Sequence, residues 1–192
     1  VSRPAMTDTN AREDKKVNAL STDDQDAVGR LFTGDIDIAI ARDGTWYHEG
    51  GPIRRPRMVA LFASILHREA DGEYYLKTPV EKRRIRVEDV PFVAVEATIR
   101  GEGAGQSVTF RTNVDETVAA GPGHPIRVAI DQVSGEPSPY VHVRDGLEAL
   151  IVRSVYYQLV NAGRMSECDG WEVLGIDSCG VFFTLGALDD DA

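Results

Sequence analysis

The stretch "GDIDIAIARDGTWYHEGG", residues 34–51, decides the first part of the fold because it has the pattern of a complete β-hairpin. Ile36, Ile38 and Ile40 alternate with small or acidic residues at the two-residue period of a strand that is buried on one face. Asp43-Gly44 is typical of a tight hairpin turn. Residues 45–48 therefore form the returning strand, and residues 50–52, Gly-Gly-Pro, end it.

A segment with helical periodicity follows the hairpin. Pro56 suits the first turn of a helix. Apolar residues then occur at i, i+3, i+4, i+7 and i+8, which predicts a helix with one buried face: Met58, Leu61, Phe62, Ile65 and Leu66. The helix should end near residues 70–72, Ala-Asp-Gly. Further strands are expected at residues 73–76, 85–90, 92–99, 107–113 and 126–130.

A second Arg-Asp-Gly sequence lies in "VHVRDGLEAL", residues 141–150. The apolar spacing after it predicts an amphipathic helix, with Asp145 and Glu148 spaced as a capping box. The inward residues would be Leu147, Leu150, Ile151, Val155 and Leu159. Both predicted helices lead to an Asp-Gly-aromatic strand, at residues 71 and 169. We interpret this recurring order as an internal duplication.

The predicted fold class is α+β, with two related α+β halves, mostly antiparallel strands and one main helix in each half. A chain of 192 residues can form one ordinary domain or two small ones. We divide it into a polar N-terminal segment at residues 1–30, an N-terminal half at residues 31–100 and a C-terminal half at residues 101–192. A short helix in the first segment would be capped by Ser21 or Thr22.

The charge of the chain narrows the classes of partner. With 21 basic and 31 acidic side chains the net charge is −10, which argues against nucleic-acid binding because that binding neutralises phosphates. No apolar run approaches the roughly 18 residues of a membrane span, so we expect no membrane partner and a cytoplasmic location. The basic residues nevertheless form two clusters, which could hold a small anion or could be solvated faces: residues 54–57 and residues 82–86.

The sequence shows no catalytic or metal-binding motif. The four histidines lack the i, i+2 or i, i+4 spacing of metal motifs, so we expect no metal and no cofactor. Cys168 and Cys179 are interpreted as buried free thiols. A non-enzymatic protein is therefore expected. The alternative is a hydrolase in which His48 or His142 is the general base.

A candidate binding site combines an aromatic ring with guanidinium groups. Trp46 and His48 share one face of the returning strand, and Arg54 and Arg57 follow at the predicted helix start, whose free amides also favour anions. An aromatic plane next to arginines suits a flat ring that carries a phosphate or carboxylate. The alternative is that Trp46 belongs to the core and that the arginines pair with the surplus acidic residues.

Residues 34–96 resemble a proteobacterial family catalogued as domain of unknown function 1285. The matching motifs are Ile-x-Ile-x-Arg-Asp-Gly-x-Trp, Gly-x-Pro-Ile, Asp-Gly-x-Tyr-x-Leu, Thr-Pro-Val-Glu-Lys and Val-Glu-Asp-x-Pro-Phe. FRTNVDE, residues 110–116, and DGWEVLGIDSCGVFFTLG, residues 169–186, are also similar. The resemblance implies a duplicated α+β core whose C-terminal half is loosely like a pleckstrin-homology fold. It also implies a small, nucleotide-like ligand between the halves and a part in signal transduction.

Together these observations predict a non-catalytic ligand-binding or signalling module. Its partners would be a small anionic ligand and another signalling protein, with no nucleic acid and no membrane. A protein-interaction adaptor that uses an open strand edge is a further alternative. The residues expected to line the site between the halves are Trp46, His48, Arg54, Arg57, Thr78, Glu81, Arg111 and Asn113.

Overall fold

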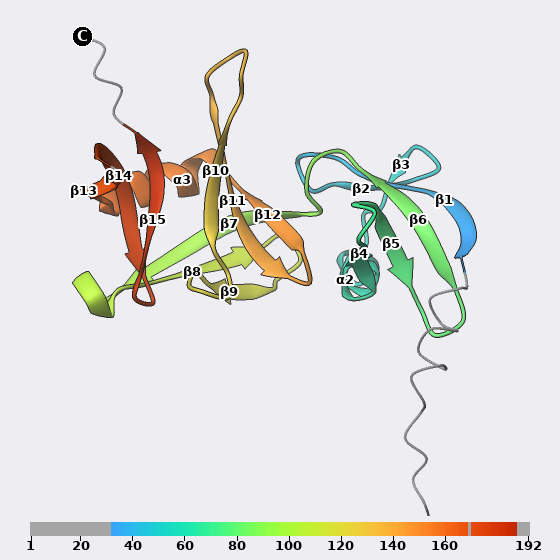
Figure 1. The fold of residues 1–192 in the computed structure, drawn as a ribbon. Helices are drawn as coiled ribbons and strands as arrows, with labels where there is room; N and C mark the ends of the chain where they lie inside the picture. The colour runs from blue at the N-terminus through green and yellow to red at the C-terminus, as the bar shows by residue number, and fades with distance from the viewer. Residues whose placement is uncertain (1–31, 169, 188–192) are drawn as a thin grey trace, which may run out of the picture. The chain divides into compact units, whose positions relative to one another are not determined.

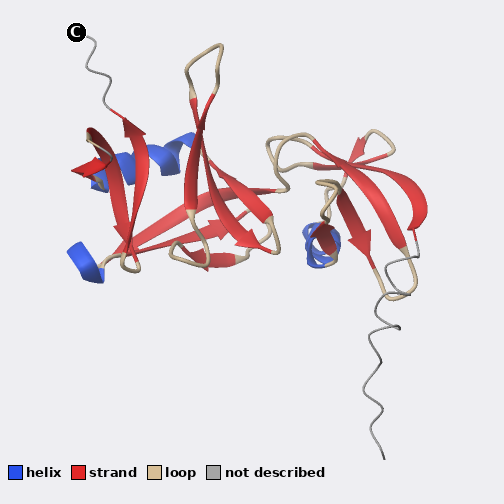
Figure 2. Cartoon of the chain, in the orientation of Figure 1, coloured by secondary structure: helices blue, strands red, loops and turns tan. Residues whose placement is uncertain are grey.

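The computed structural model describes residues 32–168 and 170–187, and these residues are mostly β. Strands make up 54% of them and form three sheets (Figure 2). The helices in this part of the chain are α2 (Pro56–Ser64), α3 (Arg153–Ala162) and the 3-10 turn η1 (Gly103–Gly105). The helix expected near Ser21 lies outside the described residues. None of the described helices has the length and apolar character needed to cross a membrane.

The first sheet is built around the predicted hairpin, which is confirmed. Strand β1 pairs antiparallel with β2 so that Ile38 lies opposite His48 and Ile40 opposite Trp46. On its other side β1 pairs with β6 in parallel, and the strand order is β3-β2-β1-β6-β5-β4 (Figure 1). The strands are β1 (Phe32–Ile40), β2 (Trp46–His48), β3 (Gly51–Pro52), β4 (Leu66–Arg68), β5 (Tyr74–Lys77) and β6 (Lys82–Val87).

The remaining strands form a second sheet of six strands and a third sheet of three. The second has the order β10-β11-β12-β7-β8-β9, and the third has the order β13-β14-β15. Strand β7 pairs with β8 and β12 and so belongs to the second sheet, although the division made from the sequence assigns all of it to the N-terminal half. The strands are β7 (Phe92–Arg100), β8 (Ser107–Thr112), β9 (Thr117–Ala119), β10 (Ile126–Ile130), β11 (Pro137–Arg144), β12 (Leu147–Ile151), β13 (Arg164–Cys168), β14 (Trp171–Ser178) and β15 (Val181–Ala187).

Helix α2 begins at Pro56 as predicted but ends earlier than the apolar spacing suggests. The Ser64 hydroxyl donates to the Leu61 carbonyl, and Ile65 follows as the C-cap. Leu66 then enters β4, where it lies opposite Leu76 and is fully buried. The apolar residue that prolongs the helical pattern is therefore a strand residue, because pairing with β5 ends the helix.

The predicted helix over residues 147–159 is wrong in its first part. Residues 147–151 form strand β12, in which Leu147, Ala149 and Ile151 are buried at a two-residue period. Asp145 does not cap a helix. It has a positive φ of 46° in the turn between β11 and β12, followed by Gly146 at 74°. Helix α3 starts only at Arg153, because β12 first pairs with both β11 and β7.

The prediction of two related α+β halves with one main helix each is wrong, and so is the pleckstrin-homology-like C-terminal half. The order hairpin, helix, hairpin does recur, but the strands pair differently. In the first half β6 returns to β1 and closes a single sheet. In the second half β12 pairs with β7, while β13, β14 and β15 form a sheet of their own. Short turn motifs recur in sequence without a recurring sheet.

The two Arg-Asp-Gly sequences have a shared structural role at the junction of the first and second sheets. From the first sheet, Arg42 reaches the Ser138 hydroxyl on β11 at 2.8 Å and Asp89 at 3.4 Å. From the second sheet, Arg144 donates to the carbonyls of Ala63 at 2.7 Å and Leu66 at 3.4 Å, and it pairs with Glu116. Each arginine therefore binds the sheet to which it does not belong.

Asn113 completes the junction through Gly44. Its side chain donates to the Gly44 carbonyl at 3.1 Å and accepts from the Val93 amide at 3.0 Å. A β-carbon at Gly44 would lie 2.5 Å from the Asn113 amide nitrogen and 2.8 Å from a Val93 methyl group. Only glycine allows this close approach.

We expect Gly44→Ala to destabilise the protein more than Gly50→Ala. Both glycines have a positive φ, 81° and 76°, so both variants carry a backbone penalty of about 1 kcal/mol. Nothing lies within 4 Å of a β-carbon at Gly50, whereas the clash at Gly44 adds about 1–3 kcal/mol. Urea unfolding of the two variants measures the difference, and equal free energies of unfolding would contradict the junction geometry.

Arg144→Ala should lower the free energy of unfolding by about 2 kcal/mol or more, because hydrogen bonds from a charged donor are lost and Glu116 is left unpaired. The Arg144 side chain is 28% exposed. Arg153→Ala is the control, since its side chain is 74% exposed and its ion pair with Glu136 spans 3.9 Å. That variant should change stability by about 0.5 kcal/mol or less. Similar losses for the two variants would refute the role of Arg144.

Candidate functional site

The structure brings the predicted site residues together only in part. Trp46, Arg54 and Asn113 line a pocket of about 260 Å³ between β2, the start of α2 and the loop after β8. His48 and Arg54 line a second pocket of about 580 Å³, which we call the α2 groove. The α2 groove is formed by Ile36, Ile38, His48, Gly51, Pro52, Ile53, Arg54, Arg55, Met58 and Phe62.

Trp46 is a core residue, as in the alternative interpretation of the sequence. It is 1% exposed and stacks on Phe62 with ring centroids 6.1 Å apart. Its indole Nε1 has no hydrogen-bond partner among the described residues. The ring therefore offers no open face on which a ligand could stack.

Three predicted site residues make structural contacts in other places. Arg111 pairs with Glu96 at 2.7 Å and with Asp115 at 3.0 Å. The Thr78 amide donates to the Glu81 carbonyl at 2.8 Å and closes the turn between β5 and β6. Glu81 also forms an ion pair with Arg83. These contacts explain the three residues without a ligand.

His142 and His48, the two candidate general bases, differ in hydrogen bonding and exposure. The His142 Nδ1 can only donate to the Gly123 carbonyl at 3.1 Å, and its Nε2 can only accept from the Gly146 amide at 3.2 Å. Both ring nitrogens of His142 are therefore engaged in hydrogen bonds that hold turns. His48 is exposed and lines the α2 groove. The hydrolase alternative consequently rests on His48 alone.

The cysteines and acidic residues provide no further chemistry in the described ranges. Cys168 and Cys179 are free, but both are exposed, so the expectation that they are buried is wrong. The ranges 32–168 and 170–187 contain no group of three or more His, Cys, Asp or Glu side chains placed to hold a metal ion.

Three arginines without carboxylate partners among the described residues lie at the start of helix α2. Arg54, Arg55 and Arg57 are all exposed, and none has an ion-pair partner among the residues that the structure describes. Arg55 is the N-cap but makes no side-chain capping bond, and the first turn contains no acidic residue. The N-terminal end of a helix is the positive end of its dipole, so arginines there are unfavourable unless an anion is near.

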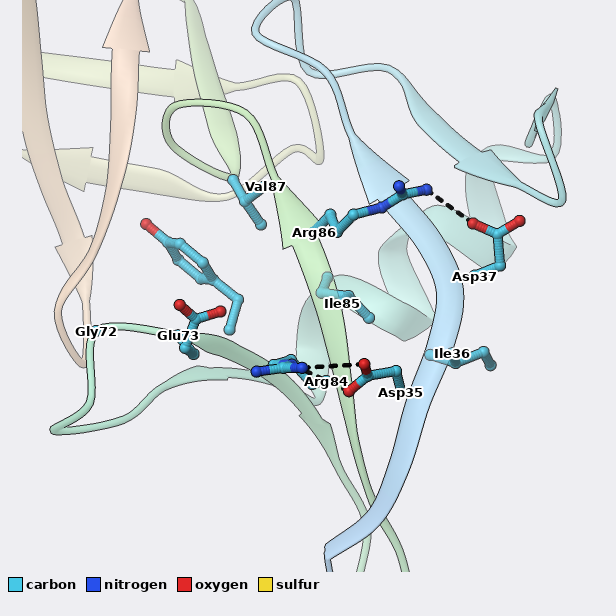
Figure 3. Close-up of a pocket in the computed structure, with 10 residues that line it drawn as sticks. Asp35, Ile36, Asp37, Gly72, Glu73, Arg84, Ile85, Arg86 and Val87 are labelled. Atoms are coloured by element: carbon cyan, nitrogen blue, oxygen red, sulfur yellow. Dashed lines mark hydrogen bonds and ion pairs between the residues drawn. The ribbon is translucent and has the colours of Figure 1, made fainter.

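The second basic cluster, residues 82–86, is neutralised by ion pairs with acidic side chains. Arg84 and Arg86 line a pocket of about 720 Å³ on β1, β5 and β6 (Figure 3). Arg84 pairs with Asp35 at 2.9 Å and Arg86 with Asp37 at 2.8 Å. These pairs are drawn as dashed lines in Figure 3, and they join neighbouring strands across the pocket wall. The lining of this pocket thus contains two arginines and three carboxylates, whereas the described residues that line the α2 groove include arginines and no carboxylate.

The Asp35 pair predicts how stability depends on pH. Hydrogen bonds from Arg84 lower the pKa of Asp35 below 3.8. The pair therefore stabilises the folded protein above pH 3.8, and this contribution is lost as the pH falls through the lowered pKa. Asp35→Asn should make the free energy of unfolding fall less steeply between about pH 5 and pH 2. Urea titrations at several pH values measure the slope. Glu102→Gln is the control, and an equal effect of both variants would contradict the prediction.

Comparisons with known proteins agree with this architecture. The N-terminal part of the chain matches the model "Domain of unknown function (DUF1285), N-terminal domain" over residues 30–90. The remainder matches "Protein of unknown function (DUF1285), C-terminal domain" over residues 91–185. No curated protein matches the chain.

Two crystal structures are similar to this chain. A DUF1285 family protein from Silicibacter pomeroyi DSS-3 is 52% identical over 84% of this chain and 87% of that one, with a TM-score of 0.75. A DUF1285 family protein from Shewanella baltica OS155 is 30% identical over 65% of this chain and 90% of that one, with a TM-score of 0.51. The resemblance found in the sequence motifs is thereby confirmed: the chain belongs to the DUF1285 family.

Proposed function

We propose that this chain is a non-catalytic module that binds a small anion at the mouth of the α2 groove. The observation that carries the proposal is the group of three exposed arginines at the start of α2, which have no acidic partner within the described residues. Arg54 and Arg55 line the groove itself. Guanidinium groups bind carboxylates and phosphates through paired hydrogen bonds, which suits this position.

The contrast with other arginines supports the proposal. Arg84, Arg111 and Arg164 each pair with a carboxylate at 3.0 Å or less. In a chain with a net charge of −10, acidic side chains are abundant, so three neighbouring arginines without one are unexpected. A local positive field on an acidic protein attracts a small anion and does not attract a long polyanion.

The size of the pockets favours the α2 groove over the junction of the two sheets. Ligand pockets typically have volumes of about 300–1,000 Å³. The α2 groove has a volume of about 580 Å³, which lies in this range. The pocket lined by Trp46, Arg54 and Asn113, at the junction of the two sheets, has a volume of about 260 Å³. A nucleotide base stacked on Trp46 is disfavoured because that ring is buried. The proposed site is therefore the groove on the first sheet and α2, and not the junction between the two sheets.

Anion binding should depend on Arg54 and Arg55. We expect phosphate or acetate to stabilise the protein, by about 2.7 kcal/mol at a hundred times the dissociation constant. Arg54→Gln and Arg55→Gln should each weaken binding by about tenfold or more, because each removes charge-assisted hydrogen bonds. Isothermal titration calorimetry measures the affinities.

Arg86→Gln is the matched control, since it removes the same charge from an arginine that is paired with Asp37 and lies outside the groove lining. If neither anion binds the wild type, or if all three variants bind equally, the proposed site is wrong. A signalling role and a cytoplasmic location remain predictions that these measurements do not address.

A further inference from the structure

We infer that the anion bound by the α2 groove is the head group of an amphiphile, a carboxylate that carries an unbranched acyl chain. This inference rests on the proposed function and adds a ligand class to it. The basic residues occupy only part of the groove. Apolar side chains form the rest of its lining: Ile36 and Ile38 on β1, Pro52 on β3, Ile53 between β3 and α2, and Met58 and Phe62 on α2.

The apolar side chains of the groove line a pocket that is open to water. Ile38 is 1% exposed, so it lies at the bottom of the groove, whereas Met58 is 40% exposed on the α2 side. Ile36, Ile53 and Phe62 are partly buried. An apolar ligand is favoured in a concave pocket with exposed apolar surface because it removes that surface from water. A methionine side chain also adapts its shape to a flexible chain.

The polar groups that line the groove define the head group. His48, Arg54 and Arg55 are basic, and the ten lining residues include no acidic, amide or hydroxyl side chain. The side chains therefore offer donors and positive charge but nothing that would recognise the edge of a nucleotide base or the hydroxyls of a sugar. An apolar body with one anionic end satisfies both parts of the lining. A cationic amphiphile would be repelled, and a neutral one would leave the arginines without a partner.

Octanoate, octanol and acetate test the inference because they separate the chain from the charge. We expect octanoate to bind at least tenfold more tightly than acetate, since each methylene that leaves water contributes about fourfold in affinity. Octanol, which has the chain without the carboxylate, should bind at least tenfold more weakly than octanoate. Calorimetry at ligand concentrations below micelle formation measures all three affinities.

A pair of variants on α2 tests the location. Met58→Gln keeps the length of the side chain but makes the groove wall polar, so it should weaken octanoate at least threefold and leave acetate unchanged. Leu61→Gln is the matched control: Leu61 is 61% exposed on the same helix but is not among the groove residues. With methyl-labelled methionine, octanoate should shift the NMR signal of Met58 and leave that of Met165 on β13 in place.

The outcomes separate this inference from the proposed function. Equal affinity for acetate and octanoate, both lost in Arg54→Gln, would overturn the acyl chain while the anion site stands. Binding of octanol as tight as that of octanoate would overturn the anionic head. Absence of binding by all probes, phosphate included, would overturn both proposals. A change of oligomeric state in Met58→Gln without any octanoate effect would assign the groove to a second copy of this chain and overturn the inference.

Discussion

The guanidinium of Arg144 joins helix α2 to the second sheet, and together with Arg42 and Asn113 it forms contacts between the first and second sheets. The last carbonyls of a helix have no partner within the helix. Arg144 donates to the carbonyl of Ala63 in the last turn of α2 and to that of Leu66 on β4, and its own charge is balanced by Glu116. A cation at this end also interacts favourably with the helix dipole. The C-terminal end of α2 is therefore satisfied by a residue that lies 81 positions further along the chain.

The opposite end of α2 has the reverse electrostatics. Three arginines lie at the positive end of the helix, and the described residues place no carboxylate beside them. Natural sequences are usually consistent across local preference, charge and packing, and they depart from this consistency at functional sites. At the end of α2 that meets the second sheet, the Ala63 carbonyl has a hydrogen-bond partner. At the end that borders the groove, the charges of the arginines have no partner among the described residues. This asymmetry is the physical basis for placing the anion at the groove and not at the junction.

The two Arg-Asp-Gly sequences show that a repeated motif can have a structural role and need not mark a binding site. Arg42 and Arg144 cross the junction in opposite directions, and Gly44 lets Asn113 approach. These residues are explained by the contacts between sheets. The residues that have no counterpart in the second motif are His48 and the arginines after it, and their side chains form no ion pair within the described residues. Asn113, predicted as a ligand residue, is better explained by its hydrogen bonds to Gly44 and Val93.

Local patterns in the sequence determined the hairpin at Asp43-Gly44, the start of α2 at Pro56, the strand at residues 126–130 and the family. The structural features among these depend on turn chemistry, a fixed backbone angle or a two-residue period, which act between near neighbours, and the family follows from the matching motifs. The apolar residues at 147, 150 and 151 satisfy a helical spacing and so predict a helix, whereas pairing with β7 and β11 selects a strand.

Only the tertiary structure decided which charges are neutralised. Arg84 and Arg111 look like Arg54 in the sequence, but distant strands bring Asp35 and Glu96 beside the first two. It also decided that Trp46 is core, because α2 places Phe62 against it. Ion pairing and burial depend on residues that are close in space and remote along the chain. A candidate site near residue 54 could therefore be proposed from the sequence, whereas the lining of the groove and its unpaired charges could not be predicted.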